Sequence, residues 1–342
     1  MTERDEYKSL FPWFGGKSSV ADVIWGALGD CDNYVEPFFG TGAVLFLRPH
    51  EPKIETINDA DGFVANFWRA VKAAPDAVSE HADNPVNECD LHARHLWLIG
   101  QRERITDHLC GDPDWFDAKA AGWWCWGQCC WIAGGWCSGK GPWQSVDGVM
   151  VLGGAGQGVN RQRPHLGDAG QGVNRQLPHL GDAGRDTIKL YREHIAEQIR
   201  WFANRLRRVR VCCGDWSRVV TKVPTFNHGT TGVFLDPPYS AEANRDMDCY
   251  AVDCGSVAHA VREWAIEAGK NPLMRIVLAG YEGEHAMPTD WRTVEWKAQG
   301  GYSNKATGES QGKKNQHRER LWLSPACLAS VPDEPSLFGA QA

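Results

Sequence analysis

The chain has 342 residues, of which 42% are hydrophobic, and this is enough apolar surface to bury a substantial core. Its start is charged and polar, and no stretch supplies the ~18 consecutive apolar residues that a membrane span needs. The twelve cysteines lack the regular spacing of a disulfide framework. We therefore exclude a fully disordered chain and expect a soluble, unsecreted, cytoplasmic protein with reduced thiols and no membrane partner.

The net charge of -7 is mildly unfavourable for a nucleic-acid partner, because phosphate binding needs a surplus of lysine and arginine. The charge is unevenly distributed, however. Basic residues form one run at Arg200, Arg205, Arg207, Arg208 and Arg210, and a second at Lys313, Lys314, His317, Arg318 and Arg320. A positive cleft on an acidic body is compatible with these runs, and so is ordinary solvated surface charge.

Residues 13–18, with the sequence WFGGKS, have some likeness to a phosphate-binding loop. The consensus G-x-x-x-x-G-K-[ST] would need its first glycine at position 11, which is Phe11 in this chain. The segment therefore does not predict a phosphate site, and we interpret Lys17 as the partner of a carboxylate, such as that of a methionine moiety.

A short apolar run at Tyr34-Val35 leads into Glu36 and a turn that contains Gly40 and Gly42. Strands that end in an acidic residue or a glycine turn are typical of a parallel sheet whose strand ends carry ligand. Glycines in such a turn let the backbone approach a ligand closely. A short Gly-x-Gly is weak support by itself, so it needs an acidic residue at the end of the next strand to indicate a nucleoside site.

The next apolar run ends at Asp59, nineteen residues after Gly40, where an acidic side chain would bind ribose hydroxyls. A nicotinamide dinucleotide would also fit this arrangement. The turn lacks the full G-x-G-x-x-G, however, and Glu36 would repel a pyrophosphate. These features favour a nucleoside without phosphates, such as S-adenosylmethionine.

Between residues 85 and 185 the alternation of strands and helices fails, and the composition shifts to tryptophan, cysteine and glycine. Residues 122–143 contain six tryptophans. Residues 156–169 and 170–183 are two copies of one 14-residue sequence that differ only at Arg163 and Leu177. We interpret the repeat as a duplication within a glycine-rich loop, with a duplicated ligand site as the alternative.

Four cysteines of this region, Cys125, Cys129, Cys130 and Cys137, have the ligand type that tetrahedral zinc prefers. Their spacing is not a paired C-x-x-C, and tryptophans surround them. We therefore expect buried thiols that pack among aromatic rings and no metal, with zinc as the alternative.

The alternation resumes in the second half of the chain. Thr187 to Val209 has a helical apolar stripe, and Ser256 to Gly269 has another. The apolar runs 209–213, 233–235 and 275–279 lie around these helices and end before Gly214-Asp215, Asp236 and Gly280. The pattern predicts an open α/β sheet.

The most specific motif is Asp236-Pro237-Pro238-Tyr239, at the end of the apolar run 233–235. An aspartate at the carboxyl end of a buried strand faces the ligand crevice, and two prolines make the following turn stiff. A side-chain carboxylate and a backbone carbonyl can then accept both hydrogens of one amino group, while Tyr239 offers a flat face to a base. An ordinary strand-to-loop turn is the alternative.

These motifs resemble those of the DNA adenine methyltransferases of the bacterial Dam type, in the same order and over nearly the whole chain. The resemblance rests on residues 12–17, the turn at 36–43, Asp59 and the motif at 236–239. It implies an α/β fold, the Rossmann-like sheet of class I S-adenosylmethionine-dependent methyltransferases, with an inserted, mainly helical and loop domain for target recognition. It divides the chain into a cofactor half at 1–84, the insertion at 85–185, a catalytic half at 186–330 and a flexible tail at 331–342.

The resemblance also implies roles for individual residues, with S-adenosylmethionine as cofactor. The implied cofactor-binding residues are Trp13, Lys17, Glu36, Phe38, Gly40, Gly42, Asp59, Asp215 and Trp216. The implied catalytic residues are Asp236, Pro237, Pro238 and Tyr239. The implied DNA-binding residues are Lys140, Lys305, Lys313, Lys314 and Arg318, which would contact phosphates.

The implied reaction is methyl transfer to the exocyclic amine of an adenine flipped out of double-stranded DNA at a defined sequence, in a restriction-modification or phage DNA modification system. No obligatory protein partner is indicated. Cytosine is the closest alternative target, because its exocyclic amine needs the same two acceptors. A non-catalytic DNA-binding relative and a methyltransferase of RNA or protein amines are further alternatives.

Overall fold

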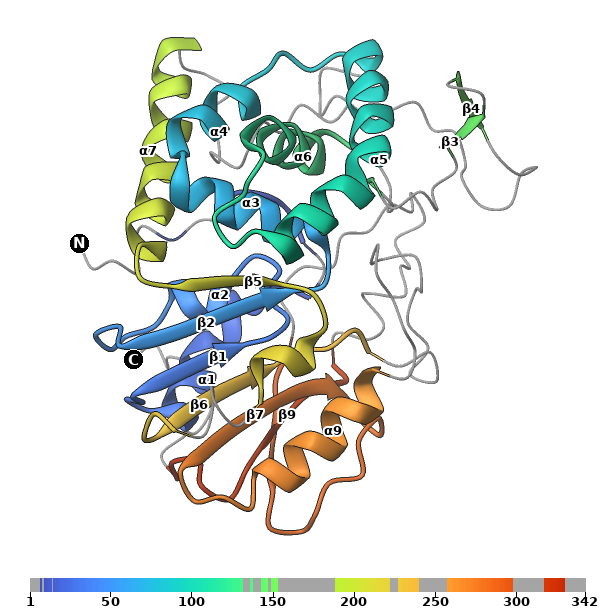
Figure 1. The fold of residues 1–342 in the computed structure, drawn as a ribbon. Coiled ribbons are helices and arrows are strands. Elements are labelled where there is room, and N and C mark those ends of the chain that lie inside the picture. The colour runs from blue at the N-terminus through green and yellow to red at the C-terminus, as the bar shows by residue number, and fades with distance from the viewer. Residues whose placement is uncertain are drawn as a thin grey trace, which may run out of the picture.

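The computed structural model describes residues 7, 9–13, 15–131, 136–137, 143–146, 149–152, 188–221, 227–239, 257–297 and 317–329. The tandem repeat, the predicted tail and Lys140, Lys305, Lys313 and Lys314 lie outside these residues. The described part consists of a twisted sheet with a layer of helices beside it (Figure 1). None of the described helices is long and apolar enough to cross a membrane.

The sheet has seven strands in the order β5-β2-β1-β6-β7-β9-β8. The five parallel strands are β1 (Asn33–Glu36), β2 (Ile54–Asp59), β5 (Arg210–Cys213), β6 (Thr231–Leu235) and β7 (Met274–Tyr281). The antiparallel strands β8 (Arg292–Glu295) and β9 (Glu319–Leu323) extend the β7 edge. This mostly parallel sheet confirms the predicted Rossmann-like α/β class.

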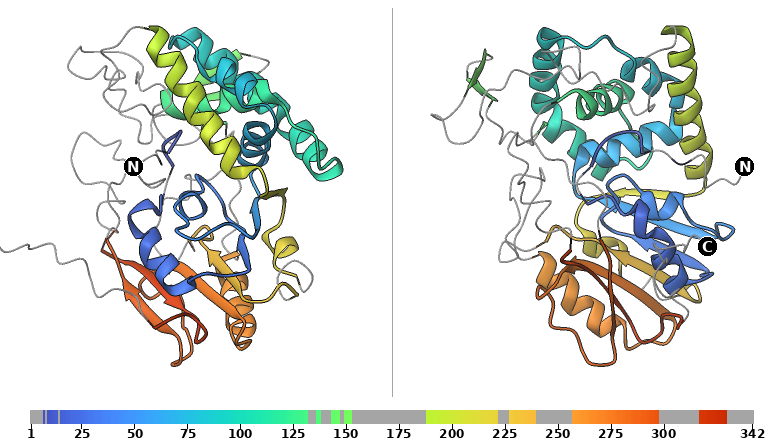
Figure 2. Two further views of the ribbon diagram at one scale, coloured as in Figure 1. Left: turned by 90° about the vertical axis from the view of Figure 1, so that its left-hand side faces the viewer. Right: turned by 180° about the vertical axis from the view of Figure 1, so that it is seen from behind.

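The strands β1 and β6 lie at the centre of the sheet, and all of their residues are buried. Helices cover both faces of the central strands, with α1 (Ala21–Leu28) and α9 (Val257–Ala268) on opposite sides (Figures 1 and 2). The short helix α2 (Ala43–Phe46) follows the turn after β1. The chain runs from β1 toward one edge of the sheet and from β6 toward the other, so a ligand crevice is expected where the carboxyl ends of these two strands meet.

A layer of helices lies beyond the β5 edge of the sheet (Figure 1). It contains α3 (Gly62–Ala73), α4 (Pro75–Ala82), α5 (Glu88–Gly111), α6 (Ala118–Cys130) and α7 (Ile188–Leu206). The strands β3 (Trp143–Val146) and β4 (Val149–Leu152) form a separate antiparallel pair. The predicted boundary at residue 85 falls between α4 and α5, inside the layer, and the proposed division into domains stays a prediction.

Buried aromatic rings join the helical layer to the segment that precedes the sheet. Phe11 packs edge-on against Phe67 and Trp124, with ring centroids 5.3 and 4.9 Å away, and it also contacts Trp68. Phe202 of α7 packs against Trp68 at 5.5 Å. Residues near the N-terminus, in α3, in α6 and in α7 therefore share one hydrophobic core.

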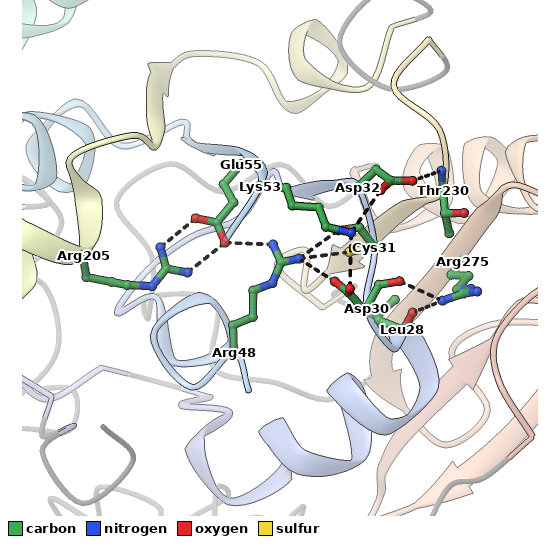
Figure 3. Close-up of polar contacts among 10 residues, drawn as sticks. All are labelled: Leu28, Asp30, Cys31, Asp32, Arg48, Lys53, Glu55, Arg205, Thr230 and Arg275. Carbon is green, nitrogen blue, oxygen red and sulfur yellow. Dashed lines mark hydrogen bonds and ion pairs between the residues drawn. The ribbon is translucent and has the colours of Figure 1, made fainter. Parts of the chain in front are cut away.

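Charged side chains connect the amino-terminal ends of the central strands (Figure 3). The Glu55 carboxylate, on β2, accepts hydrogen bonds from Arg48 at 3.0 Å and from Arg205 at 2.6 and 2.8 Å. Lys53 lies 3.1 Å from Asp32, next to β1. Arg205, which the sequence grouped with a basic run, is thus bound to a buried carboxylate.

Candidate functional site

The turn after β1 adopts backbone conformations that require glycine. Gly40 and Gly42 have φ values of +49° and +69°. A Cβ atom on Gly40 would lie 2.8 Å from the Trp13 indole nitrogen, and one on Gly42 would lie 2.3 Å from the Phe39 ring. The Trp68 indole donates a hydrogen bond to the Gly40 carbonyl at 2.8 Å. The sequence predicted that a ligand would approach the backbone of this turn closely. In the structure, aromatic side chains of the chain itself approach it.

Asp59 stands at the end of β2, beside this turn. Its two carboxylate oxygens accept hydrogen bonds from the backbone N–H groups of Gly40 at 3.0 Å and Asp61 at 2.9 Å. Burial raises the pKa of Asp59 to about 7, although these two hydrogen bonds oppose the shift. Each oxygen retains a second lone pair, so the carboxylate can still accept from a ligand hydroxyl.

Asn58, the residue before Asp59, links two of the turns at the strand ends. Its amide nitrogen donates to the Pro37 carbonyl at 3.1 Å and to the Gly214 carbonyl at 2.9 Å. Sequence reasoning missed this role of Asn58. The only local feature of the sequence that could have indicated this role is an asparagine directly before the aspartate that ends the strand.

A cavity of about 220 Å³ opens at the carboxyl ends of β1, β2, β5 and β6. Of the predicted cofactor residues, Trp13, Lys17, Glu36, Phe38, Gly40, Asp59, Asp215 and Trp216 line it, together with Asp236 and Pro238. Gly42, Pro237 and Tyr239 are not among the lining residues. The lining also includes residues that the sequence did not single out as ligand contacts, namely Gly15, Gly16, Asn58, Asp61, Phe234 and Val257.

Two aromatic rings of the cavity come from different strand ends. Phe38 follows β1, and Trp216 begins the short 3-10 helix η5 (Trp216–Val219) after β5. Their ring centroids are 6.3 Å apart, with planes inclined by 29°. Asp215 caps this helix, accepting from the Ser217 N–H at 2.9 Å. The predicted aromatic and acidic residues of two separate turns therefore meet at one cavity.

Lys17 forms an ion pair with Asp236, 219 residues away in the chain. The Lys17 ammonium donates to the Asp236 carboxylate at 2.7 Å and to the Gly15 carbonyl at 2.8 Å. The side chains of Lys17 and Asp236 are 4% and 21% exposed. The carboxylate partner expected for Lys17 is in this structure an aspartate of the predicted catalytic motif.

Tyr239 is buried beside this ion pair. Its hydroxyl donates to the Glu319 carboxylate at 2.8 Å, and the ring packs edge-on against Tyr281 at 4.5 Å. The Lys17 ammonium lies over the Tyr239 ring, 5.6 Å from its centroid. Burial, and then the negative charge of Glu319, raise the pKa of Tyr239 well above its usual value, so the hydroxyl keeps its proton.

Glu36 is buried at the end of β1 and accepts a hydrogen bond from the Tyr34 hydroxyl at 2.8 Å. Burial raises its pKa well above the usual range, and the charge of Asp236 adds to this shift. Burial therefore favours the neutral carboxyl, and Glu36 repels a pyrophosphate less strongly than expected from the sequence.

The four cysteines considered for zinc, Cys125, Cys129, Cys130 and Cys137, are buried thiols. Within the described ranges, no three histidine, cysteine or carboxylate side chains gather closely enough to hold a metal ion. Burial raises the pKa values of Cys130 and Cys137, which disfavours the thiolate forms that bind metals.

Among the predicted DNA-binding residues, Arg318 is the one that the structure describes. Its guanidinium lies over the Tyr281 ring, 5.3 Å from the centroid. It thus stands next to the aromatic ring that packs on Tyr239.

Comparison with known families gives one match. Residues 13–94 match the sequence model of the family described as D12 class N6 adenine-specific DNA methyltransferase. The matched segment contains Trp13, Lys17, the glycine turn and Asp59, and it stops before the Asp-Pro-Pro-Tyr motif. No curated protein matches the chain.

Proposed function

We propose that this chain, whose residues 13–94 match the D12 class of N6 adenine-specific DNA methyltransferases, is such an enzyme and acts on double-stranded DNA, at a defined sequence, through the cavity at the carboxyl ends of the central strands. The observation that carries the proposal is the position of Asp236. It ends the central strand β6 in the same cavity as the glycine turn and Asp59. One cavity thus combines an acceptor for a target amine with groups suited to a nucleoside. Action on DNA would place the protein in the cytoplasm of a bacterial or phage-infected cell.

The charge of the cavity fits S-adenosylmethionine, whose sulfonium supplies the methyl group when bound. Five carboxyl side chains line the cavity, and Lys17 is the one lysine or arginine among the described lining residues. A cationic nucleoside is attracted by such a lining, whereas a pyrophosphate would lack partners. Asp59 would hold the ribose hydroxyls, and Phe38 and Trp216 would contact the adenine ring.

The target amine would be activated by two acceptors at the end of β6. The Asp236 carboxylate and the Pro237 carbonyl would each accept one amino hydrogen of the flipped adenine. These hydrogen bonds raise the electron density on the nitrogen and direct its lone pair toward the methyl group. Catalysis by this site would consist of orientation and electrostatic stabilisation, with no covalent enzyme intermediate.

Lys17 would also take part in this reaction, because its ammonium donates to the Asp236 carboxylate that the target amine would use. It lies 2.7 Å from the carboxylate and over the Tyr239 ring, where the amine of a base stacked on Tyr239 would donate. Entry of the base would displace the ammonium, which can then turn to the methionine carboxylate of the cofactor. The ion pair satisfies Asp236 until DNA binds.

The decisive experiment is to incubate the purified protein with S-adenosylmethionine and unmethylated double-stranded DNA, digest the DNA and separate its nucleosides by mass spectrometry. N6-methyladenine is the expected product. Sequencing of methylated bases should place it at one defined sequence. N4-methylcytosine as the main product would overturn the choice of base, and methylation of single strands alone would overturn the choice of duplex DNA.

A further inference from the structure

A second aromatic residue faces the Lys17 ammonium, in addition to Tyr239. Trp296 directly follows β8, and its ring lies over the ammonium with the centroid 5.7 Å away. The corresponding distance to the Tyr239 ring is 5.6 Å. The same ammonium is bound to the Asp236 carboxylate. A group that takes the place of the ammonium would therefore meet two aromatic rings and one carboxylate.

Glu319 holds both aromatic residues in place. Its carboxylate accepts from the Tyr239 hydroxyl at 2.8 Å, and its backbone carbonyl accepts from the backbone N–H of Trp296 at 3.3 Å. Glu319 is 5% exposed and begins β9, which pairs with β8 in the antiparallel register Glu295 with Arg320. The antiparallel extension of the sheet thus brings Trp296 to the base of the catalytic motif.

The Trp296 side chain has a polar atom without a partner among the described residues. Its indole N–H is buried and makes no hydrogen bond to any part of the chain that the structure describes. A buried donor left unsatisfied costs about 1–3 kcal/mol. Several core tryptophans find an acceptor, as Trp25, Trp68 and Trp126 do here, although the buried Trp131 indole also lacks one among the described residues. A bound nucleotide brings acceptors to the site, in its ring nitrogens, sugar oxygens and phosphate.

We propose that Trp296 is a second aromatic wall of the subsite for the flipped base, and that Glu319 is the positioning residue that sets both walls. This inference rests on the proposed function. The purine enters beside Tyr239 and Trp296 in place of the Lys17 ammonium, and its amine replaces the ammonium at Asp236. An aromatic ring binds the face of any base, so Trp296 contributes affinity for the flipped base and Asp236 contributes recognition of the amine.

The test compares Trp296→Ala and Trp296→Phe with Trp201→Ala, which removes a half-buried tryptophan of α7 that packs on Phe46 and Phe202. Methyl transfer to unmethylated genomic DNA and binding of S-adenosylmethionine are measured for each variant. We expect Trp296→Ala to lower kcat/KM for DNA about 10- to 100-fold, as loss of one base–aromatic contact does, with the cofactor Kd unchanged. Trp296→Phe should retain most activity, and Trp201→Ala should match the wild type.

Glu319 is tested by Glu319→Gln and Glu319→Leu. The glutamine keeps an acceptor for the Tyr239 hydroxyl and should retain activity, whereas the leucine removes that acceptor and should lower kcat/KM for DNA through Tyr239, while the backbone hydrogen bond to Trp296 remains. A purely structural role of Glu319 would lower thermal stability in both variants and leave kcat/KM of the folded protein unchanged.

Equal kcat/KM for Trp296→Ala and Trp201→Ala, with Asp236→Ala inactive, would overturn the proposal and leave the proposed function intact. The same holds if both Trp296 variants bind the cofactor normally and transfer methyl groups at the wild-type rate. Absence of methylated adenine with the wild-type protein would instead reject the proposed function. Should Trp296→Ala fail to fold, Trp296→Phe takes its place in the comparison, and its binding of S-adenosylmethionine shows that its own fold is intact.

Discussion

The two ends of the central strands carry charge in opposite arrangements. At the amino-terminal end, Glu55 is shared by Arg48 and Arg205, and the side chains of Arg48 and Glu55 are 0% and 2% exposed (Figure 3). At the carboxyl-terminal end, five carboxyl groups line one cavity that contains a single lysine among its described residues. In the first arrangement each buried carboxylate is paired with arginine, whereas in the second Lys17 pairs with Asp236, and Glu36 and Asp59 are buried with raised pKa values.

The pKa shifts follow the same division. Hydrogen bonds from Lys53 lower the pKa of Asp32 at the amino-terminal end. Burial raises the pKa values of Glu36 and Asp59 at the carboxyl-terminal end. Carboxyl groups that are buried without cations are expensive to keep ionised, and such groups are concentrated at ligand sites. We expect substitutions at the amino-terminal end to change stability and those at the carboxyl-terminal end to change activity.

The largest effect is expected for Glu55→Ala. It removes the buried carboxylate that Arg48 and Arg205 share and leaves only the half-exposed Asp30 beside Arg48, which should lower the free energy of unfolding by about 3–5 kcal/mol. Urea denaturation measures the change, and Glu51→Ala, which removes an exposed glutamate nearby, serves as control. The specific activity of the folded fraction should stay at the wild-type level. A loss of activity without a loss of stability would contradict the expectation that the amino-terminal ends of the strands serve stability and not activity.

Asp236→Ala should instead act mainly on activity. Removing one acceptor of the target amine should lower kcat about 10²–10³-fold, as the loss of one preorganised group in other active sites does. Cofactor binding should change little, because Asp236 is assigned to the target base, whereas the melting temperature should fall because the buried Lys17 ammonium loses its carboxylate partner. Titration with S-adenosylmethionine and a melting curve test both points, and equal loss of binding and transfer would contradict the assignment.

Asp59→Ala should weaken cofactor binding by about 1–3 kcal/mol, the range for losing a charge-assisted hydrogen bond. The pKa of Asp59 near 7 adds a pH dependence. Because this pKa is raised, the neutral form contributes stability at low pH that is lost as the pH rises through about 7. The ionised form binds ribose hydroxyls more strongly, so cofactor affinity should rise between about pH 6 and pH 8.

Calorimetric titration of wild type and Asp59→Asn across this pH range separates the effect from ionisation of the cofactor itself. The asparagine variant should lose the part of the pH dependence that comes from Asp59. Identical pH profiles for the two proteins would remove Asp59 from the binding site.

The smallest effect is expected for Lys53→Ala. Its ion pairs with Asp30 and Asp32 are largely exposed, and such pairs contribute little because water screens them. The melting temperature should stay within error of the wild type. A marked decrease would show that the exposed part of the amino-terminal network stabilises the fold as strongly as its buried part does.

The sequence by itself determined which strands carry functional groups at their ends. Apolar runs followed by Glu36, Asp59 and Asp236 predicted a parallel sheet, and in such a sheet the carboxyl ends of neighbouring strands must lie together. The glycine turn was readable for the same reason, because a positive φ needs glycine locally. Strand periodicity and turn conformation depend on near neighbours in the chain, and they can be inferred without the fold.

Only the tertiary structure decided which side chains meet. Lys17 pairs with Asp236 across 219 residues, and Tyr239 with Glu319 across 80. Arg205 looked like part of a basic surface and is bound to buried Glu55. Trp296 had no sequence signal, since its position depends on how β8 and β9 join the sheet edge. The partner of a charged or aromatic side chain is chosen by long-range packing and burial, and a local sequence pattern does not contain that information.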